Sequence, residues 1–174
     1  MIDGALINNV LRFILLVLAQ WLLFQQIAYS WGDRSLLSVL VYPLFIMLLP
    51  LRTPATLVVV LGFLAGISVD YFYQTPGLHA AAATFTGFAR PLVLRLYEPR
   101  EGYNLKDSPV KEDLGSTWFL RYSATLLIGH LFFYFMVQAF SHLFIVDVIL
   151  RTLISFVASW LIVVALVFIF NPKS

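Results

Sequence analysis

Six long apolar runs joined by very short links dominate this sequence. They cover about residues 11–30, 36–51, 55–73, 76–97, 118–143 and 146–170. A helix that crosses a membrane needs about 20 mostly apolar residues, and every run except the short second one comes close to that length. Links such as Arg52–Pro54 and Gln74–Thr75 force consecutive helices to pack as antiparallel hairpins. The sequence therefore predicts one all-α membrane domain over residues 1–174, with about six transmembrane helices.

The composition supports lipid as the solvent of this chain. Hydrophobic residues make up 61% of it and charged residues 11%, whereas soluble domains carry roughly 25% charged residues. No tract indicates disorder, nucleic-acid binding or a fibrous repeat. The absence of cysteine excludes disulfides and cysteine-ligated metals. The first apolar run is too long for a signal peptide and lacks a small-residue cleavage site, so we expect a retained helix.

The placement of Lys and Arg predicts the orientation. Basic residues gather near helix ends on the cytoplasmic side of membranes. With the N-terminus in the cytoplasm, the inner side holds Arg12, Arg52, Arg90, Arg95, Arg100, Lys106, Lys111, Arg121 and Lys173. The outer side then holds only Arg34 and Arg151. We expect both termini and the polar loop at residues 98–116 to be cytoplasmic, although five spans would place the C-terminus outside.

The third run carries a stripe of special residues. Gly62, Gly66 and Asp70 are spaced four residues apart, so they lie on one helix face. Two glycines at this spacing let membrane helices approach closely. Asp70 is therefore expected on a packing face, near the outer end of its helix, where a charge costs much less than at the bilayer centre.

The turn after this helix predicts a partner for Asp70. Thr75 is a plausible N-cap and Pro76 a plausible first residue of the next helix. Gly77 and His79 follow, and His79 could donate a hydrogen bond to Asp70. The positive end of the new helix also suits a carboxylate. Asp70 is thus interpreted as pinning this hairpin, with a binding or partner contact and a catalytic acid or base as the alternatives.

The fourth run combines a smooth face with an unusual basic dipeptide. The small residues Ala80, Ala83, Thr84 and Gly87 share one face and can receive the glycine stripe. Pro91 cannot donate to the carbonyl of Gly87, so we expect a kink there. Arg90 is expected to reach toward the cytoplasmic end, as an orientation anchor or lipid contact or in a salt bridge to a partner. The loop that follows is a solvated segment or a docking site.

Polar residues in the last two runs leave few chemical options. His130 and Gln138 are expected to make hydrogen bonds between helices. His79, His130 and His142 lack metal-ligand spacing, and no cofactor is expected. Asp147 and Arg151 are expected to form a local pair at i, i+4. Asp70 with Asp147 could also form an intramembrane aspartyl protease, which is the weakest hypothesis because no supporting motif accompanies them.

These motifs resemble the rod shape-determining protein MreD family. The resemblance rests on Gly62, Phe63, Gly66 and Asp70, then Pro76, Gly77, Leu78, His79 and Ala80, then Gly87 and Phe88. The continuation from Arg90 and Pro91 to Pro99, Arg100, Glu101, Gly102 and Tyr103 is similar to the members from Bacteroidetes-type bacteria. The specific part covers about residues 62–103. Elsewhere the likeness is mostly one of hydropathy.

This resemblance implies a non-enzymatic scaffold in the bacterial inner membrane that serves cell elongation and peptidoglycan synthesis. Its direct partner would be MreC, a protein with one span and a periplasmic domain. Through MreC it would be linked to the MreB filament and to RodA with its penicillin-binding protein. Family members are also similar in fold to the substrate-binding subunits of energy-coupling-factor vitamin transporters. A vitamin-binding subunit is therefore the alternative function.

Overall fold

Helices form almost all of the regular structure in this chain, seen in a computed structural model that describes residues 4–27, 29–31, 34–104, 108–139 and 145–170. Within these residues the elements, in chain order, are α1 (Gly4–Ala19), the π-helical turn η1 (Gln20–Phe24), β1 (Tyr29–Trp31), β2 (Arg34–Leu37), α2 (Leu44–Met47), α3 (Ala55–Tyr73), α4 (Leu78–Leu96), α5 (Lys111–Leu114), α6 (Ser116–Ala139) and α7 (Ile145–Phe170). The two strands pair as a small antiparallel hairpin.

Among the described residues, four helices are long and apolar enough to cross a membrane. They are the α1–η1 segment from Ile7 to Phe24, α3, α6 and α7. The predicted bounds of α3 agree with the structure, and those of α6 and α7 differ by a few residues. α4 is as long as α3 but less apolar, because it carries two arginines and a histidine. Length and composition thus support a multi-pass membrane protein.

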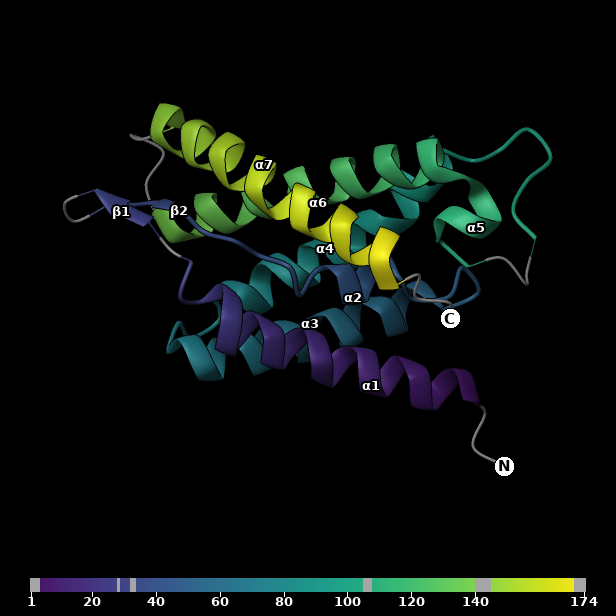
Figure 1. Cartoon of the computed structure of the whole chain (residues 1–174), viewed down its shortest axis with the longest axis horizontal. Helices are drawn as coiled ribbons and strands as arrows, with labels where there is room; N and C mark the ends of the chain where they lie inside the picture. The colour runs from purple at the N-terminus through teal and green to yellow at the C-terminus, as the bar shows by residue number, and fades with distance from the viewer. Residues whose placement is uncertain (1–3, 28, 32–33, 105–107, 140–144, 171–174) are drawn as a thin grey trace.

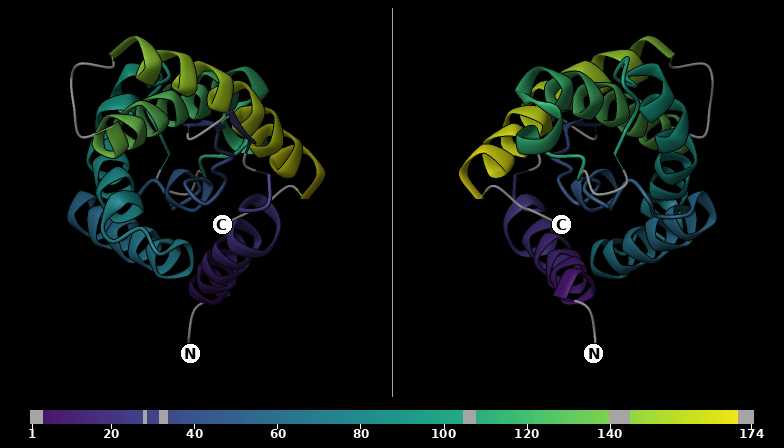
Figure 2. Two further views of the ribbon diagram at one scale, coloured as in Figure 1. Left: turned by 90° about the vertical axis from the view of Figure 1, so that its left-hand side faces the viewer. Right: turned by 90° about the vertical axis from the view of Figure 1, so that its right-hand side faces the viewer.

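The long helices surround residues 38–50, which we call the central segment and which include α2. Figure 2 shows α1, α3, α4, α6 and α7 in an arc, with α2 inside it. In chain order each helix packs on the next around this arc, and α2 contacts α1, α3, α4 and α6. All of residues 39–49 are buried. In Figure 1 the start of α1, α5 and the end of α7 lie toward one end of the bundle, whereas β1 and β2 lie at the other.

The predicted second transmembrane helix at residues 36–51 is wrong. Only the four residues of α2 are α-helical there, and the preceding residues 38–41 have no regular structure. Apolar composition correctly indicated burial, but it did not distinguish a lipid-facing helix from a segment enclosed by protein. Non-helical backbone is tolerated at membrane depth when protein groups satisfy it. Pro43, which has no N–H, also shortens the possible helix.

Side chains from both ends of the sequence satisfy the backbone of this central segment. The side-chain amide of Gln20 accepts from the Val41 N–H at 2.7 Å and donates to the Val39 carbonyl at 2.9 Å. The hydroxyls of Ser155 and Ser159 in α7 accept from the N–H groups of Ser38 and Leu40, each at 3.0 Å. Scattered polar residues in apolar helices therefore determine where the central segment lies.

The polar loop at residues 98–116 is not wholly solvated, contrary to the default expectation. Ser108, Pro109 and Val110 are buried. The Tyr103 hydroxyl donates to the Leu94 carbonyl at 2.7 Å, and burial raises the pKa of Tyr103, so that hydroxyl keeps its proton.

Among the other predictions, the end of the fifth run, His142, Lys106 and Lys173 fall outside the described residues.

Candidate functional site

The most extensive helix contact in the described chain is that of α3 with α4, which form a hairpin. A Cβ added at Gly62 would lie 2.7 Å from the carbonyl oxygen of Ala83, and one at Gly66 would lie 2.6 Å from the Ala80 nitrogen. A Cβ at Gly87 would lie 3.0 Å from the carbonyl oxygen of Val58. These neighbours are backbone atoms, so they cannot move aside as a flexible side chain would. The three glycines therefore occupy the packing positions that the sequence pattern predicts for them.

Asp70 joins the end of α3 to the start of α4. Its side chain is only 4% exposed. Oδ1 accepts from the His79 N–H and the Thr75 hydroxyl, and Oδ2 accepts from the Ala80 N–H, each at 2.9 Å. The first N–H groups of a helix lack partners inside the helix, and its N-terminal end favours negative charge. Asp70 thus caps α4 from the neighbouring helix.

The turn between these helices differs in detail from the prediction. Gln74 ends α3 in the left-handed conformation, with φ of 55°. Gly77, with φ of 84°, is the N-cap of α4, which begins at Leu78, so Thr75 is not the predicted N-cap and Pro76 is not the predicted first helical residue. Glycine adopts this conformation without steric cost, and the Thr75 hydroxyl turns to Asp70 instead. The remote carboxylate replaces the local cap that Thr75 would have supplied.

The His79 ring does not bind Asp70, contrary to the expectation. Only its backbone N–H reaches the carboxylate. The side chain is fully buried, and neither ring nitrogen has a hydrogen-bond partner within the described structure. The rings of Tyr42, Tyr73 and Tyr134 surround it, with centroids 5.5, 4.9 and 5.0 Å away. His79 is therefore an aromatic-like packing residue here.

A short polar chain that the sequence did not reveal lies beside His79. The Tyr42 hydroxyl lies 3.2 Å from both the His79 carbonyl oxygen and Nε2 of His130. Nδ1 of His130 lies 2.7 Å from the hydroxyl of Thr86. This chain connects the central segment, α4 and α6, and it fits the interhelical bonds expected for His130. Gln138, by contrast, is exposed. Tyr42 was missed because it lies in the run interpreted as a lipid-facing helix.

Arg90 points into the bundle, so its predicted contacts with lipid headgroups or a partner are wrong. It is 1% exposed, and Nη2 donates to the carbonyls of Leu49 and Pro50. Nε donates to the Tyr122 hydroxyl at 3.1 Å, which in turn donates to the Met47 carbonyl at 3.0 Å. Carbonyls that end a helical turn attract cations. Arg90 and Tyr122 thus hold the end of the central segment.

The remaining predicted residues occupy separate places. α4 continues through Pro91 to Leu96, so the helix does not break there. Arg100 is exposed in the loop. Asp147 and Arg151 form the expected pair, at 2.8 Å on α7. Asp70 is held by α4, and α3 is not a neighbour of α7, so the structure does not bring these two described aspartates together as a protease would require.

The arrangement contains no recognised metal centre. Among the described residues, no three His, Asp or Glu side chains gather where they could hold an ion. Asp70 instead binds the start of α4, and Gln20 and Arg90 bind backbone of the central segment. The fold is an α-helical bundle with a capped, glycine-packed hairpin, and the length and composition of its four long apolar helices support a multi-pass membrane protein. Comparisons with protein families, curated proteins and solved structures find no match.

Substitution of Asp70 tests its role as a cap. We expect Asp70→Leu to lower the free energy of unfolding by about 2 kcal/mol, because three donors lose their acceptor. Asp70→Asn should lower the free energy of unfolding by about half as much as Asp70→Leu, since the amide oxygen of the new asparagine still accepts two hydrogen bonds. Unfolding in mixed micelles with increasing SDS measures both losses. Asp147→Asn is the control, with an expected loss below about 1 kcal/mol. Equal losses for Asn and Leu at Asp70 would contradict the capping role.

Proposed function

We propose that this protein is a non-enzymatic scaffold of the cell-elongation complex in the bacterial inner membrane, as a member of the MreD family. Its partner would be a single-span protein of the MreC type, which links it to the MreB filament and to RodA with its penicillin-binding protein. The observation that carries this proposal is that Gly62, Gly66, Asp70 and Gly87 all serve one helix contact. The motif residues behind the family resemblance thus pack α3 against α4 and cap the start of α4.

The lipid-facing surface of α1 offers room for a partner's helix. Only 17% of the residues in the α1–η1 span are buried inside the protein, against 44% in α6. α1 packs on α2 and α3. We propose that the partner's single span lies along this surface.

We also propose that the chain passes through the bilayer six times, with the central segment as the second passage and the N-terminus in the cytoplasm.

A vitamin-binding transporter subunit is the less favoured function. Such a site needs a pocket with several converging polar groups. The cleft found beside α1 is lined mostly by apolar residues. At the other end of α3, the side chains of Asp70, Tyr42 and His130 bind one another or backbone, and the unpartnered His79 ring is enclosed by tyrosine rings. Vitamin retained by the purified protein, with an ATPase-driven partner, would favour this alternative instead.

Affinity purification tests the proposal directly. From gently solubilised membranes of the native host, the tagged protein should retain a single-span protein with a periplasmic domain, identified by mass spectrometry. Asp70→Leu should weaken this retention and round the cells, because the hairpin of α3 and α4 loosens. Membrane levels of each variant, measured by immunoblot, separate weak binding from lost protein. Asp147→Asn should retain the partner and the rod shape.

Two outcomes would contradict the proposal. If the tagged wild-type protein retains no single-span partner and its deletion leaves rods unchanged, the scaffold function is wrong. If Asp70→Leu gives normal rods and an intact complex, partner binding does not depend on the Asp70 cap of the α3–α4 hairpin, whatever the function of the whole protein.

A further inference from the structure

A cleft opens beside the first half of α3, and we call it the α1–α3 cleft. Its volume is about 680 Å³. Its apolar wall is formed by Val10, Phe13, Phe45, Leu57, Leu61 and Leu64. Val10, Leu57 and Leu64 are each almost half exposed, so the cleft faces the surroundings of the bundle and is not a closed core cavity. In a membrane this opening would face the lipid chains.

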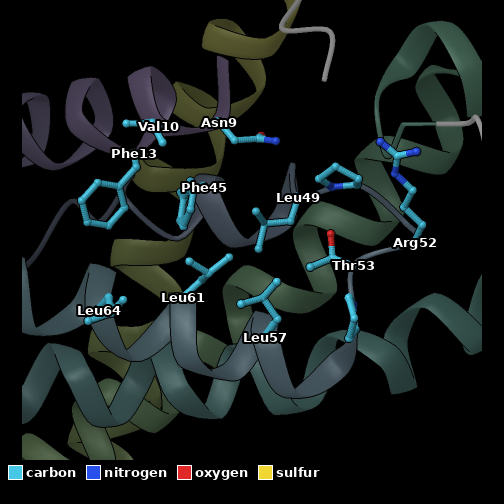
Figure 3. A pocket seen from close by; sticks show the side chains of 12 residues that line it. Asn9, Val10, Phe13, Phe45, Leu49, Arg52, Thr53, Leu57, Leu61 and Leu64 are labelled. Carbon is cyan, nitrogen blue, oxygen red and sulfur yellow. The ribbon is translucent and has the colours of Figure 1, made fainter. Parts of the chain in front are cut away.

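The two ends of the cleft differ in polarity. Figure 3 shows Thr53 and Arg52 toward one end of the cleft, Phe13 and Leu64 toward the other, and Asn9 between them. Arg52 is exposed, and within the described residues no carboxylate pairs with it. The nearby Arg12 already donates to Asn9 and to the Leu48 carbonyl. A cationic mouth therefore leads into an apolar interior.

We propose that the α1–α3 cleft binds one acyl chain of an anionic phospholipid, whose phosphate lies against Arg52. An amphipathic occupant matches both ends of the cleft, because its apolar chain covers the wall and its anionic group meets the guanidinium. Arginine suits phosphate especially well, since its planar donors match the oxygens. Basic pockets between membrane helices at the cytoplasmic side are places where anionic headgroups bind. This inference does not rest on the scaffold function.

The dimensions favour a lipid chain over a partner's helix. From Leu57 to Leu64 the α3 wall extends about 10 Å, at about 1.5 Å per residue. One leaflet contributes about 15 Å of hydrocarbon, so the cleft covers about two-thirds of a single leaflet. A spanning helix needs a contact surface about three times as long as the cleft wall, and its volume, on the order of 2,000 Å³, exceeds that of the cleft several-fold. The bulky wall residues also lack the small-residue pattern of close helix contacts.

The test measures binding of phosphatidylglycerol to the full-length protein in neutral detergent. Native mass spectrometry should detect one tightly held phosphatidylglycerol, and its addition should raise the melting temperature more than phosphatidylcholine does. Arg52→Gln should weaken the apparent affinity about fivefold, as loss of one basic contact implies. Leu57→Trp should narrow the cleft and reduce binding further. Arg95→Gln is the matched control, because it removes an exposed arginine that does not line the cleft.

Several results would overturn the proposal. Equal stabilisation by phosphatidylglycerol and phosphatidylcholine would show that no anionic lipid is selected. An equal effect of Arg52→Gln and Arg95→Gln would show that the attraction is general and not located at the cleft. A photo-crosslinker at residue 57 that captures a partner protein in membranes, and not lipid, would assign the cleft to that partner.

Discussion

Replacing Gly66 with alanine should destabilise the protein by about 3 kcal/mol, although alanine is the better helix former by about 1 kcal/mol. The added methyl group would lie 2.6 Å from the Ala80 nitrogen and close to the His79 carbonyl oxygen. Both neighbours are backbone atoms of α4, so the two helices must separate. Separation also stretches the bonds from Asp70 to the start of α4. The free energy of unfolding in SDS-containing mixed micelles measures this loss.

Gly129→Ala is the matched control for this substitution. Gly129 also lies inside a long helix, but an added Cβ would meet only the Phe85 ring, at 3.8 Å, which is an ordinary contact. We expect this variant to be neutral or slightly more stable, because only the gain in helix propensity remains. Equal losses for the two alanine variants would show that close packing of α3 on α4 does not explain the glycine stripe.

Gln20→Leu should destabilise the protein at least as much as Gly66→Ala does, and we expect it to lower the free energy of unfolding by about 4 kcal/mol. The leucine would fill similar space but would leave the Val41 N–H and the Val39 carbonyl without a partner. It would also remove the 2.7 Å contact between the side-chain amide of Gln20 and the Tyr73 hydroxyl. Each buried polar group left unpaired costs roughly 1–3 kcal/mol. Unfolding in mixed micelles and the yield of folded protein both report the effect.

Gln26→Leu provides the control, because Gln26 is exposed and, within the described residues, its amide supports no buried backbone. Gln26→Leu should lower the free energy of unfolding by less than about 0.5 kcal/mol. Gln20→Glu should fall between the two, since the carboxylate still accepts from the Val41 N–H but cannot donate to the Val39 carbonyl. A Gln20→Leu protein as stable as the wild type would mean that the central segment does not depend on this residue.

Sequence reasoning succeeded where local periodicity determines structure. The bounds of α3 followed from a long apolar run between Pro54 and the polar turn at Gln74. The glycine stripe placed Asp70 on the face toward α4, and the i, i+4 spacing gave the ion pair of Asp147 with Arg151. These features depend on residues within one helix or one hairpin, so the sequence contains nearly all of the information.

It failed where burial depends on distant parts of the chain. Tyr42 lies in an apolar run that resembles a span, yet four helices contact α2 within that run and α7 binds its first residues. Arg90 was expected to reach water, because nothing local indicates that the Leu49 and Pro50 carbonyls lie within its reach. The unpaired ring of His79 was equally hidden, since its aromatic surroundings come from α3, α6 and the central segment.

The two serine contacts of the central segment have a consequence for the order of assembly during synthesis. The amides of Ser38 and Leu40 bind hydroxyls that lie 117 and 119 residues further along the chain and are synthesised later. At about 5–20 residues per second, the ribosome needs roughly 6–24 s to make that stretch. During this interval Gln20 can already bind the segment, but Ser155 and Ser159 do not yet exist. The centre of the protein is therefore made early and completed last, when α7 arrives.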